Sequence, residues 1–532
     1  MTLTKSSFTI KRNKVMNTLL FLLLMAGFAS CSEEAGGEAN SPANAEEISA
    51  EMYGGEAHDP DIELEYDPAE HIPTDLEAVH SDRVRIEVHV EGFNSGGTAN
   101  LIGQVGENRY LADTAVIDGQ GRFVFEREEP YREGLYTVAL PTNRGFHVIL
   151  SEGQMDVSLS TVNGRLIEDM EVGEGNLENQ LLYINLKYER VNRNQIDSIN
   201  RQMNRLEEGS PEHEAEREIR DRLAAERRAH VAFIDKHYPD KLFTRYKVGG
   251  QNPVVRDIMN EDGTPDRRKQ AYYFRNEFWD NVDFSDPRLI NTPIIINKVR
   301  RYMDELVPQN ADSINKYASL LMERVLDYPE YYQFFANWIT MNFDHRETTI
   351  MDPEAVYVHM IQNYFTEDRA FWADAATIQG LQMRASEKEN SLVGMVGPDV
   401  RAKGPDGNIH SIFEMEADYI IIYMYNPTCE NCKKETPQLL EWYREWHPEA
   451  DVFAIAIDTD DREWKEYIDQ ANIHDWVNVF DPTNRAIYKT YYVNITPEIY
   501  VLNPDREIIG KNLKTFQLET IINRDKERRD AM

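Results

Sequence analysis

The pattern of apolar and polar positions changes along the chain and divides its folded part into three regions. From residue 83 to residue 165, short runs alternate between apolar and polar residues, as in Val84 to Val90. A period of two is typical of half-buried strands, and glycine-rich turn signals at 94–97 and 118–121 separate the runs. The pattern predicts an antiparallel β domain over residues 83–165.

Between residues 166 and 395 the apolar spacing becomes that of helices. Residues 196–228 are rich in Glu and Arg, which at spacings of four residues form ion pairs, so one exposed, salt-bridged helix is expected there. Apolar stripes near a period of 3.6 predict further helices over residues 294–306, 313–326 and 331–341. The aromatic residues among them are expected to fill a core rather than a ligand site.

Residues 396–532 show the pattern of an α/β domain. Tyr419 to Tyr425 is a continuous apolar run, which suits a strand that is buried on both faces of a sheet. Residues 438–446 have helical spacing, and a second apolar run follows over residues 452–457. The predicted fold class is therefore multidomain, with an antiparallel β domain, an α-helical middle region and a C-terminal α/β domain.

A Cys-x-x-Cys pair lies between the first strand of this last domain and its helix. Backbone N–H groups at a helix N-terminus stabilise negative charge, so Cys429 is favoured there as the thiolate, which is the form that attacks a disulfide. Cys432 lies about one turn further along and can resolve the mixed disulfide. We therefore predict that Cys429 is the nucleophile of a thiol–disulfide exchange, with a pKa below the ordinary value of about 8.5.

Other uses of a Cys-x-x-Cys pair fit the sequence poorly. A structural zinc site needs four ligands, and the sequence has neither a second Cys-x-x-Cys pair nor a suitably spaced pair of histidines. Peroxiredoxins place a Thr or Ser three residues before their cysteine, whereas Asn426 holds that place here. We therefore expect a redox pair that works without a metal or a cofactor.

From about Ala402 to Leu513 the chain resembles the TlpA- and ResA-like thioredoxins. Pro437 matches the proline inside the active-site helix of that family. Glu435 matches a glutamate that tunes cysteine protonation, and its alternative role is that of an ordinary carboxylate in the first turn of a helix. Thr496 and Pro497 precede a strand as the family's cis-proline does, which implies a backbone edge that binds a substrate chain.

The sequence departs from this family around the two cysteines. Thr428 stands where Trp is usual, and Asn431 stands where Pro is frequent. The carboxylate of Glu430 is expected to raise the pKa of the first thiol, whereas Lys433 and Lys434 are expected to lower it. Roles as a reductant, an isomerase or an oxidant therefore all stay open at this point.

The N-terminus is expected to be a targeting segment rather than part of the fold. Basic residues precede the apolar run Leu19 to Phe28, which is too short to span a membrane. The following Ala-Ser-Cys sequence resembles the lipobox of bacterial lipoproteins, which implies lipidation of Cys31 and a signal peptide over residues 1–31; ordinary cleavage would instead leave a free thiol. Residues 32–82 contain neither Lys nor Arg and are predicted to form an acidic, disordered tether.

The overall charge excludes one class of partner. The chain of 532 residues carries 93 acidic and 57 basic side chains, which gives a formal net charge of -36. Phosphate backbones repel such a surface, so no nucleic acid is expected as a partner.

The order of the parts also resembles a known lipoprotein architecture, namely a lipid anchor, a small β domain, a helical middle region and a TlpA-like thioredoxin domain. This resemblance implies a thiol–disulfide oxidoreductase held at the outer membrane through Cys31, on the periplasmic face in preference to the cell surface. It is expected to act on protein disulfides or dithiols as a reductant that draws electrons from a membrane donor. The alternative is a binding lipoprotein whose thioredoxin domain is mainly a scaffold.

Overall fold

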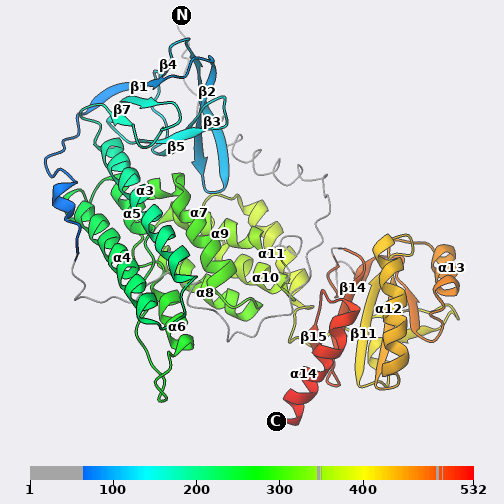
Figure 1. Ribbon diagram of the computed structural model, residues 1–532. Coiled ribbons are helices and arrows are strands. Elements are labelled where there is room, and N and C mark those ends of the chain that lie inside the picture. The colour runs from blue at the N-terminus through cyan, green and yellow to red at the C-terminus, as the bar shows by residue number, and fades with distance from the viewer. Residues whose placement is uncertain (1–63, 344–347, 349, 487–489, 494, 532) are drawn as a thin grey trace, which may run out of the picture. The chain divides into compact units, whose positions relative to one another are not determined.

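The computed structural model describes residues 64–532 apart from 344–347, 349, 487–489, 494 and 532 (Figure 1). The predicted signal peptide, Cys31 and most of the predicted tether lie outside the described residues. In the described part of the chain, eight strands come first, a series of helices follows, and a mixed α/β domain ends the chain. This order confirms the fold class that the sequence predicts.

The β domain contains the strands β1 (Ser81–Glu91), β2 (Gly97–Val105), β3 (Asn108–Ile117), β4 (Arg122–Arg127), β5 (Gly134–Ala139), β6 (Gly145–Leu150), β7 (Gln154–Val162) and β8 (Glu171–Val172). They form two four-stranded sheets with the orders β4-β1-β7-β8 and β3-β2-β5-β6. Along β1, Ile86, Val88 and Val90 are buried while the polar residues between them are not, as the period of two predicts. One pair departs from the antiparallel prediction, because β1 and β7 run parallel. Parallel strands need a long connection, and the whole second sheet lies between these two in the chain.

The middle region consists of α3 (Leu177–Met203), α4 (Pro211–His237), α5 (Leu242–Gly249), α6 (Arg267–Glu277), η2 (Pro287–Asn291), α7 (Pro293–Arg300), the π-helical η3 (Arg301–Leu306), α8 (Ala311–Arg324), α9 (Pro329–Asn342), α10 (Pro353–Tyr364) and α11 (Ala375–Glu389). Helices over 293–306, 311–324 and 329–342 agree with three of the predicted ones. Most of their aromatic residues are buried. The ring centroid of Phe335 lies 5.4 Å from that of Trp279, a buried residue just after α6. These aromatic side chains therefore build a core.

The predicted single helix over residues 196–228 is wrong, because the chain is interrupted between α3 and α4. Gly209 adopts a φ of 79°, which residues other than glycine disfavour. The Ser210 hydroxyl then accepts a hydrogen bond from the His213 N–H at 3.2 Å, and Pro211 occupies the first turn of α4. These local signals end one helix and begin the next, and they outweigh the continuous charge pattern.

Residues 65–76 of the predicted tether lie against α4 and its C-cap residue Tyr238, and they include the short helix η1 (Pro68–Glu70). The Tyr66 hydroxyl lies 2.7 Å from Nδ1 of His230, and the Tyr66 ring stacks on His71 with a centroid distance of 4.9 Å. The Tyr238 hydroxyl donates to the carbonyl of Pro73. The acidic composition of this stretch predicts disorder, but a few aromatic side chains attach its last residues to the folded part.

The C-terminal domain contains β9 (Arg401–Lys403), β10 (Ile409–Ser411), η4 (Ile412–Glu414), β11 (Tyr419–Tyr425), α12 (Glu430–Trp446), β12 (Ala450–Ala456), α13 (Asp461–Ala471), β13 (Val477–Phe480), β14 (Glu498–Leu502), β15 (Ile508–Gly510), η6 (Thr515–Gln517) and α14 (Leu518–Asp530). The seven strands form one sheet in the order β10-β9-β13-β12-β11-β14-β15. The inner strand β11 lies between β12, to which it runs parallel, and β14, to which it runs antiparallel.

Both faces of β11 are buried, as its continuous apolar run predicts. Ile421, Tyr423 and Tyr425 belong to one core, which they share with residues of α12, α13 and α14. Ile420, Ile422 and Met424 belong to a second core on the other face, with residues of η4 and β14. Figure 1 shows α12 beside β11. The chain thus carries the Cys-x-x-Cys segment from the centre of the sheet into the start of α12.

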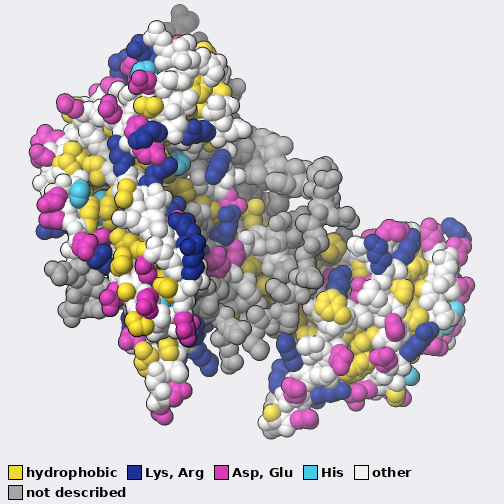
Figure 2. Space-filling model, viewed as in Figure 1, with side chains coloured by type: hydrophobic (Ala, Val, Ile, Leu, Met, Phe, Trp, Pro, Cys, Tyr) yellow, Lys and Arg dark blue, Asp and Glu magenta, His cyan; other side chains and the backbone are white. Residues whose placement is uncertain are grey.

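Acidic and basic side chains are interspersed over the face of the molecule that Figure 2 shows, despite the strongly negative net charge. On α3 and α4, ion pairs such as Arg227 with Glu189 at 3.3 Å account for part of this mixture. Of the helices among the described residues, none has the length and apolar character to cross a membrane.

Candidate active site

Cys429 lies at the N-cap of α12, directly after the turn that follows β11. The Asn426 side chain shapes this turn, because its Oδ1 accepts hydrogen bonds from the Thr428 N–H at 2.7 Å and from the Thr428 hydroxyl at 2.6 Å. Sγ of Cys429 in turn accepts a hydrogen bond from the Cys432 N–H at 3.5 Å. Both cysteines are free thiols; Cys429 is half-buried, whereas Cys432 is buried.

The surroundings of the two thiols move their pKa values in opposite directions. Burial raises the pKa of Cys429, but hydrogen bonds from Cys432 and Thr496 outweigh burial and leave that pKa below its ordinary value. Burial raises the pKa of Cys432 to about 12. Near neutral pH, the accessible sulfur is thus the one that ionises more readily.

Thr496 and Pro497 lie beside the cysteine pair, at the start of β14. This position follows from the strand register, because Glu498 of β14 pairs with Met424 near the end of β11. The Cys429 thiol donates a hydrogen bond to the carbonyl oxygen of Thr496 at 3.3 Å. Hydrogen bonding from the Thr496 side chain lowers the pKa of both thiols. The peptide bond between Thr496 and Pro497 is cis. Two segments that are far apart in the sequence therefore meet at the reactive sulfur.

Glu435 ties the active-site helix to the segment after the last strand. Its Oε1 accepts hydrogen bonds from the N–H of Thr515 at 2.8 Å and from the hydroxyl of Thr515 at 2.7 Å. The side chain is buried, and Pro437 lies two residues further along in the interior of α12. These contacts give Glu435 an anchoring role between α12 and η6.

The charged residues next to the pair partly compensate one another. Nζ of Lys433 lies 2.8 Å from Oε1 of Glu430, and this hydrogen bond lowers the pKa of the Glu430 carboxyl. Both side chains are exposed to solvent. The negative charge beside Cys429 is thus accompanied by a positive one at close range, which limits its effect on the thiol.

A buried network of hydroxyl groups below Cys432 was not predicted from the sequence. The Thr436 hydroxyl lies 2.9 Å from the carbonyl oxygen of Cys432, 2.8 Å from the Tyr423 hydroxyl and 2.7 Å from the Tyr467 hydroxyl. The network joins β11, α12 and α13 and fixes the turn of helix that carries Cys432. The tyrosines of β11 are the only sign of this hydroxyl network in the sequence, and the apolar run that contains them is equally typical of an ordinary core strand.

We expect iodoacetamide to alkylate Cys429 well before Cys432 as pH rises. Because its pKa is lowered, Cys429 forms the thiolate at a lower pH than an ordinary thiol does, whereas a pKa of about 12 keeps Cys432 protonated through the neutral range. Mass spectrometry of the peptide that contains both residues, after reaction between pH 5 and pH 10, measures the order. Faster modification of Cys432 in this range would contradict the assigned roles.

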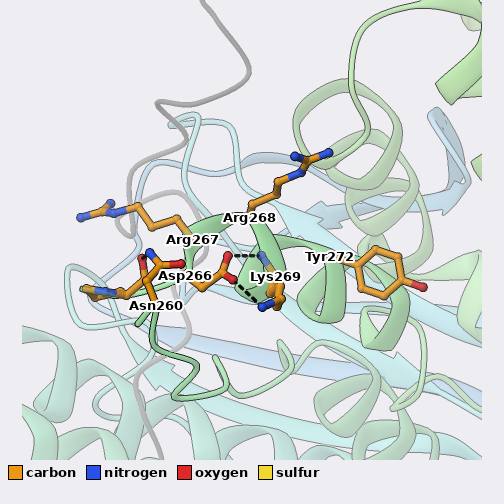
Figure 3. A pocket seen from close by; sticks show the side chains of 7 residues that line it. Asn260, Asp266, Arg267, Arg268, Lys269 and Tyr272 are labelled. Atoms are coloured by element: carbon orange, nitrogen blue, oxygen red, sulfur yellow. Dashed lines mark hydrogen bonds and ion pairs between the residues drawn. The ribbon is translucent and has the colours of Figure 1, made fainter. Parts of the chain in front are cut away.

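Two further features of the described part of the chain bear on ligand binding. No group of three or more His, Cys, Asp or Glu side chains there has the arrangement of a metal site. A hollow of about 700 Å³ lies at the start of α6, lined by Asn260, Pro265, Asp266, Arg267, Arg268, Lys269 and Tyr272. In Figure 3, Lys269 lies against Asp266, while Arg267 and Arg268 point away from it. This hollow contains none of the predicted site residues and adds no reactive group.

Comparison with known proteins agrees with the fold of this domain. Residues 417–508 match the family model of thioredoxin-like proteins. The C-terminal domain therefore has a thioredoxin-like α/β fold, and it carries the Cys-x-x-Cys pair at the N-terminus of its first long helix.

Solved structures similar to this chain include a domain of a possible thiol-disulfide isomerase from Cytophaga hutchinsonii, at 27% identity and a TM-score of 0.25, covering 26% of this chain and 97% of that one. A thioredoxin-like protein from Bacteroides caccae shares 17% identity at a TM-score of 0.42, and the match covers 51% of this chain and 97% of that one. The thioredoxin domain of a thiol-disulfide oxidoreductase from Bacteroides vulgatus shares 22% identity at a TM-score of 0.23, with 25% and 96% covered. The comparison with curated proteins found no significant match.

Proposed function

We propose that this chain is a thiol–disulfide oxidoreductase whose redox pair is Cys429 and Cys432. One observation carries the proposal: an accessible thiol of lowered pKa lies at the N-cap of α12, and a buried thiol of raised pKa follows within one helical turn. The thiolate is the nucleophile in disulfide exchange, and a second cysteine at this spacing can attack the mixed disulfide and displace the substrate sulfur. The thioredoxin-like fold of the domain supports the same class of reaction.

In the reductive direction, the Cys429 thiolate attacks one sulfur of a substrate disulfide. A mixed disulfide forms, and the other substrate sulfur leaves as a thiolate that takes up a proton. Cys432 then loses its proton and attacks Sγ of Cys429, which releases the second substrate sulfur. The substrate gains two electrons and two protons, and the chain ends with a Cys429–Cys432 disulfide. In this scheme, Thr496 and Pro497 present backbone beside Cys429 on which a substrate strand can pair.

The cellular setting that we propose rests on the sequence of the N-terminus. Lipidation of Cys31 would hold the protein at the outer membrane, on the periplasmic side, where a reductant of protein disulfides needs electrons from a donor in the membrane. The polybasic stretch, the short apolar run and the small residues before Cys31 support this setting.

The equilibrium reduction potential of the pair tests the proposed direction. Equilibration of the protein in dithiothreitol or glutathione buffers, followed by quantification of free thiols, gives this value. We expect a potential near the roughly -270 mV of thioredoxin, as a reductant requires, and a value near about -120 mV would instead indicate an oxidant. The double variant Cys429→Ser Cys432→Ser serves as the control, because it has no pair to titrate.

A further inference from the structure

Five charged side chains lie buried where the helical region contacts the C-terminal domain. Two come from the start of α10, one from the end of α11, one from the start of β14 and one from the segment after β15. Each is at most 6% exposed; they are Asp352, Glu354, Lys388, Glu498 and Lys511. We call this group the buried charge cluster. The amino-acid pattern around these residues does not distinguish them from surface charges.

Lys511 forms the centre of the buried charge cluster. Its Nζ lies 3.5 Å from Oδ1 of Asp352 and 3.4 Å from Oε2 of Glu354, and it donates a hydrogen bond to the carbonyl of Ser391 at 3.2 Å. Nζ of Lys388 lies 3.9 Å from the other carboxylate oxygen of Glu354. A lysine of the C-terminal domain is thus enclosed by groups of the helical region.

The charges within the cluster balance when one carboxyl group is protonated. Three carboxyl groups, Asp352, Glu354 and Glu498, accompany the two lysines. Burial raises the pKa of Glu498 to about 8, which favours the protonated form of this group at neutral pH. The remaining two carboxylates then match the two ammonium groups, which is the condition under which buried charges persist.

The cluster is continuous with the redox site. Glu498 directly follows Pro497, and its Oε1 accepts a hydrogen bond from the Asn512 N–H at 2.9 Å. The Asn512 side chain donates to the carbonyl of Met351 at 3.1 Å. Met351 also packs against the apolar core that contains Cys432. The start of β14, which places Thr496 against Sγ of Cys429, is therefore connected through Asn512 to the helical region.

Buried ion pairs contribute little net stability compared with apolar groups of similar size, so stability alone is a weak reason for such a cluster. We propose that Asp352, Glu354 and Lys511 are positioning residues of the redox site, which hold the Thr496–Pro497 segment against Cys429. The helical region is then part of the redox machinery rather than a separate module. The inference rests on the proposed function in taking Cys429 as the reacting thiol.

The test measures the alkylation of Cys429 by iodoacetamide across pH in variants of the full-length protein. Asp352→Asn, Glu354→Gln and Lys511→Met each remove one charge at nearly constant volume. The Thr496 side chain lowers the pKa of Cys429 by hydrogen bonding. If the segment loosens, this hydrogen bond weakens and the pKa of Cys429 rises, so alkylation at pH 7 is expected to slow about threefold to tenfold. Thr496→Val removes the donor directly and is expected to shift the profile in the same direction. Lys465→Met, at an exposed ion pair on α13, is the matched control.

Circular dichroism checks the fold of each variant, and Asp352→Asn and Glu354→Gln decide the question if Lys511→Met does not fold. Wild-type alkylation profiles in the folded cluster variants would overturn the positioning role, as would an unshifted profile for Thr496→Val. Alkylation needs no disulfide substrate. A chain that reduces no protein disulfide, and so contradicts the proposed function, would therefore still give a result on the cluster.

Discussion

Replacing Cys429 by serine is expected to reduce the disulfide reductase activity by on the order of a thousandfold or more, because a serine hydroxyl does not ionise near neutral pH and cannot form the mixed disulfide. Replacing Cys432 by serine is expected to stop the reaction one step later, since Cys429 still attacks but no second thiol releases the product. Turbidimetric reduction of insulin by dithiothreitol measures the activity of both variants.

Detection of the covalent intermediate distinguishes the two variants more clearly than the activity assay does. The Cys432→Ser protein should accumulate a mixed disulfide with a disulfide substrate, visible as an added mass on the peptide that contains Cys429, whereas Cys429→Ser should not. Cys31→Ser is the matched control and should keep full activity in the unlipidated protein, because it removes the one cysteine outside the pair. A mixed disulfide on Cys432 in the Cys429→Ser variant, at the wild-type rate, would reverse the assigned order of attack.

Replacing Asn179 by leucine is expected to destabilise the contact between the β domain and α3 by about 2 to 5 kcal/mol. The Asn179 side chain is buried, and its Oδ1 accepts from the Ile149 N–H at 2.8 Å while its Nδ2 donates to the Ile149 carbonyl, also at 2.8 Å. It therefore completes the hydrogen bonds of a residue in β6 as a neighbouring strand would. Leucine has a similar volume but leaves both backbone groups buried without a partner.

Hydrogen exchange locates this effect within the full-length protein. The amides of β6 and of the start of α3 should exchange much faster in Asn179→Leu than in the wild type, and the thermal transition of the protein should begin at a lower temperature. Asn194→Leu, at an exposed position of the same helix, should change neither quantity measurably. Wild-type exchange at Ile149 in the Asn179 variant would show that the two hydrogen bonds contribute nothing to this contact.

The features of the fold that the sequence predicts are those with a local cause. The run Tyr419–Tyr425 predicts a strand buried on both faces because every one of its side chains is apolar or aromatic, and it forms β11, an inner strand of the sheet. The parallel pairing of β1 with β7 has no such local cause, since it depends on where the chain returns after the second sheet. The interruption near Gly209 has a local signal, but the charge pattern continues on both sides of it and by itself predicts one uninterrupted helix.

The candidate site shows the same division. The Cys-x-x-Cys pair and the segment at Thr496 can be found from the sequence, because residue type and spacing carry their chemistry. The hydroxyl of Thr436 and the buried ammonium group of Lys511 cannot, since threonine and lysine are common on surfaces and only the assembled fold buries them. Groups that act by supporting other residues are therefore the part of a site that sequence patterns reveal least.

The attachment of residues 65–76 at α4 sets the range over which a lipid-anchored form of this protein could work. With an anchor at Cys31, only the chain between that residue and Leu64 would separate the bilayer from the folded part. Fully extended, this length of chain spans no more than about 120 Å, and as a random coil it averages roughly 30 Å. The folded part would then meet substrates and electron donors only within these distances of the membrane. The length of the connecting segment, rather than free diffusion, would set their local concentration.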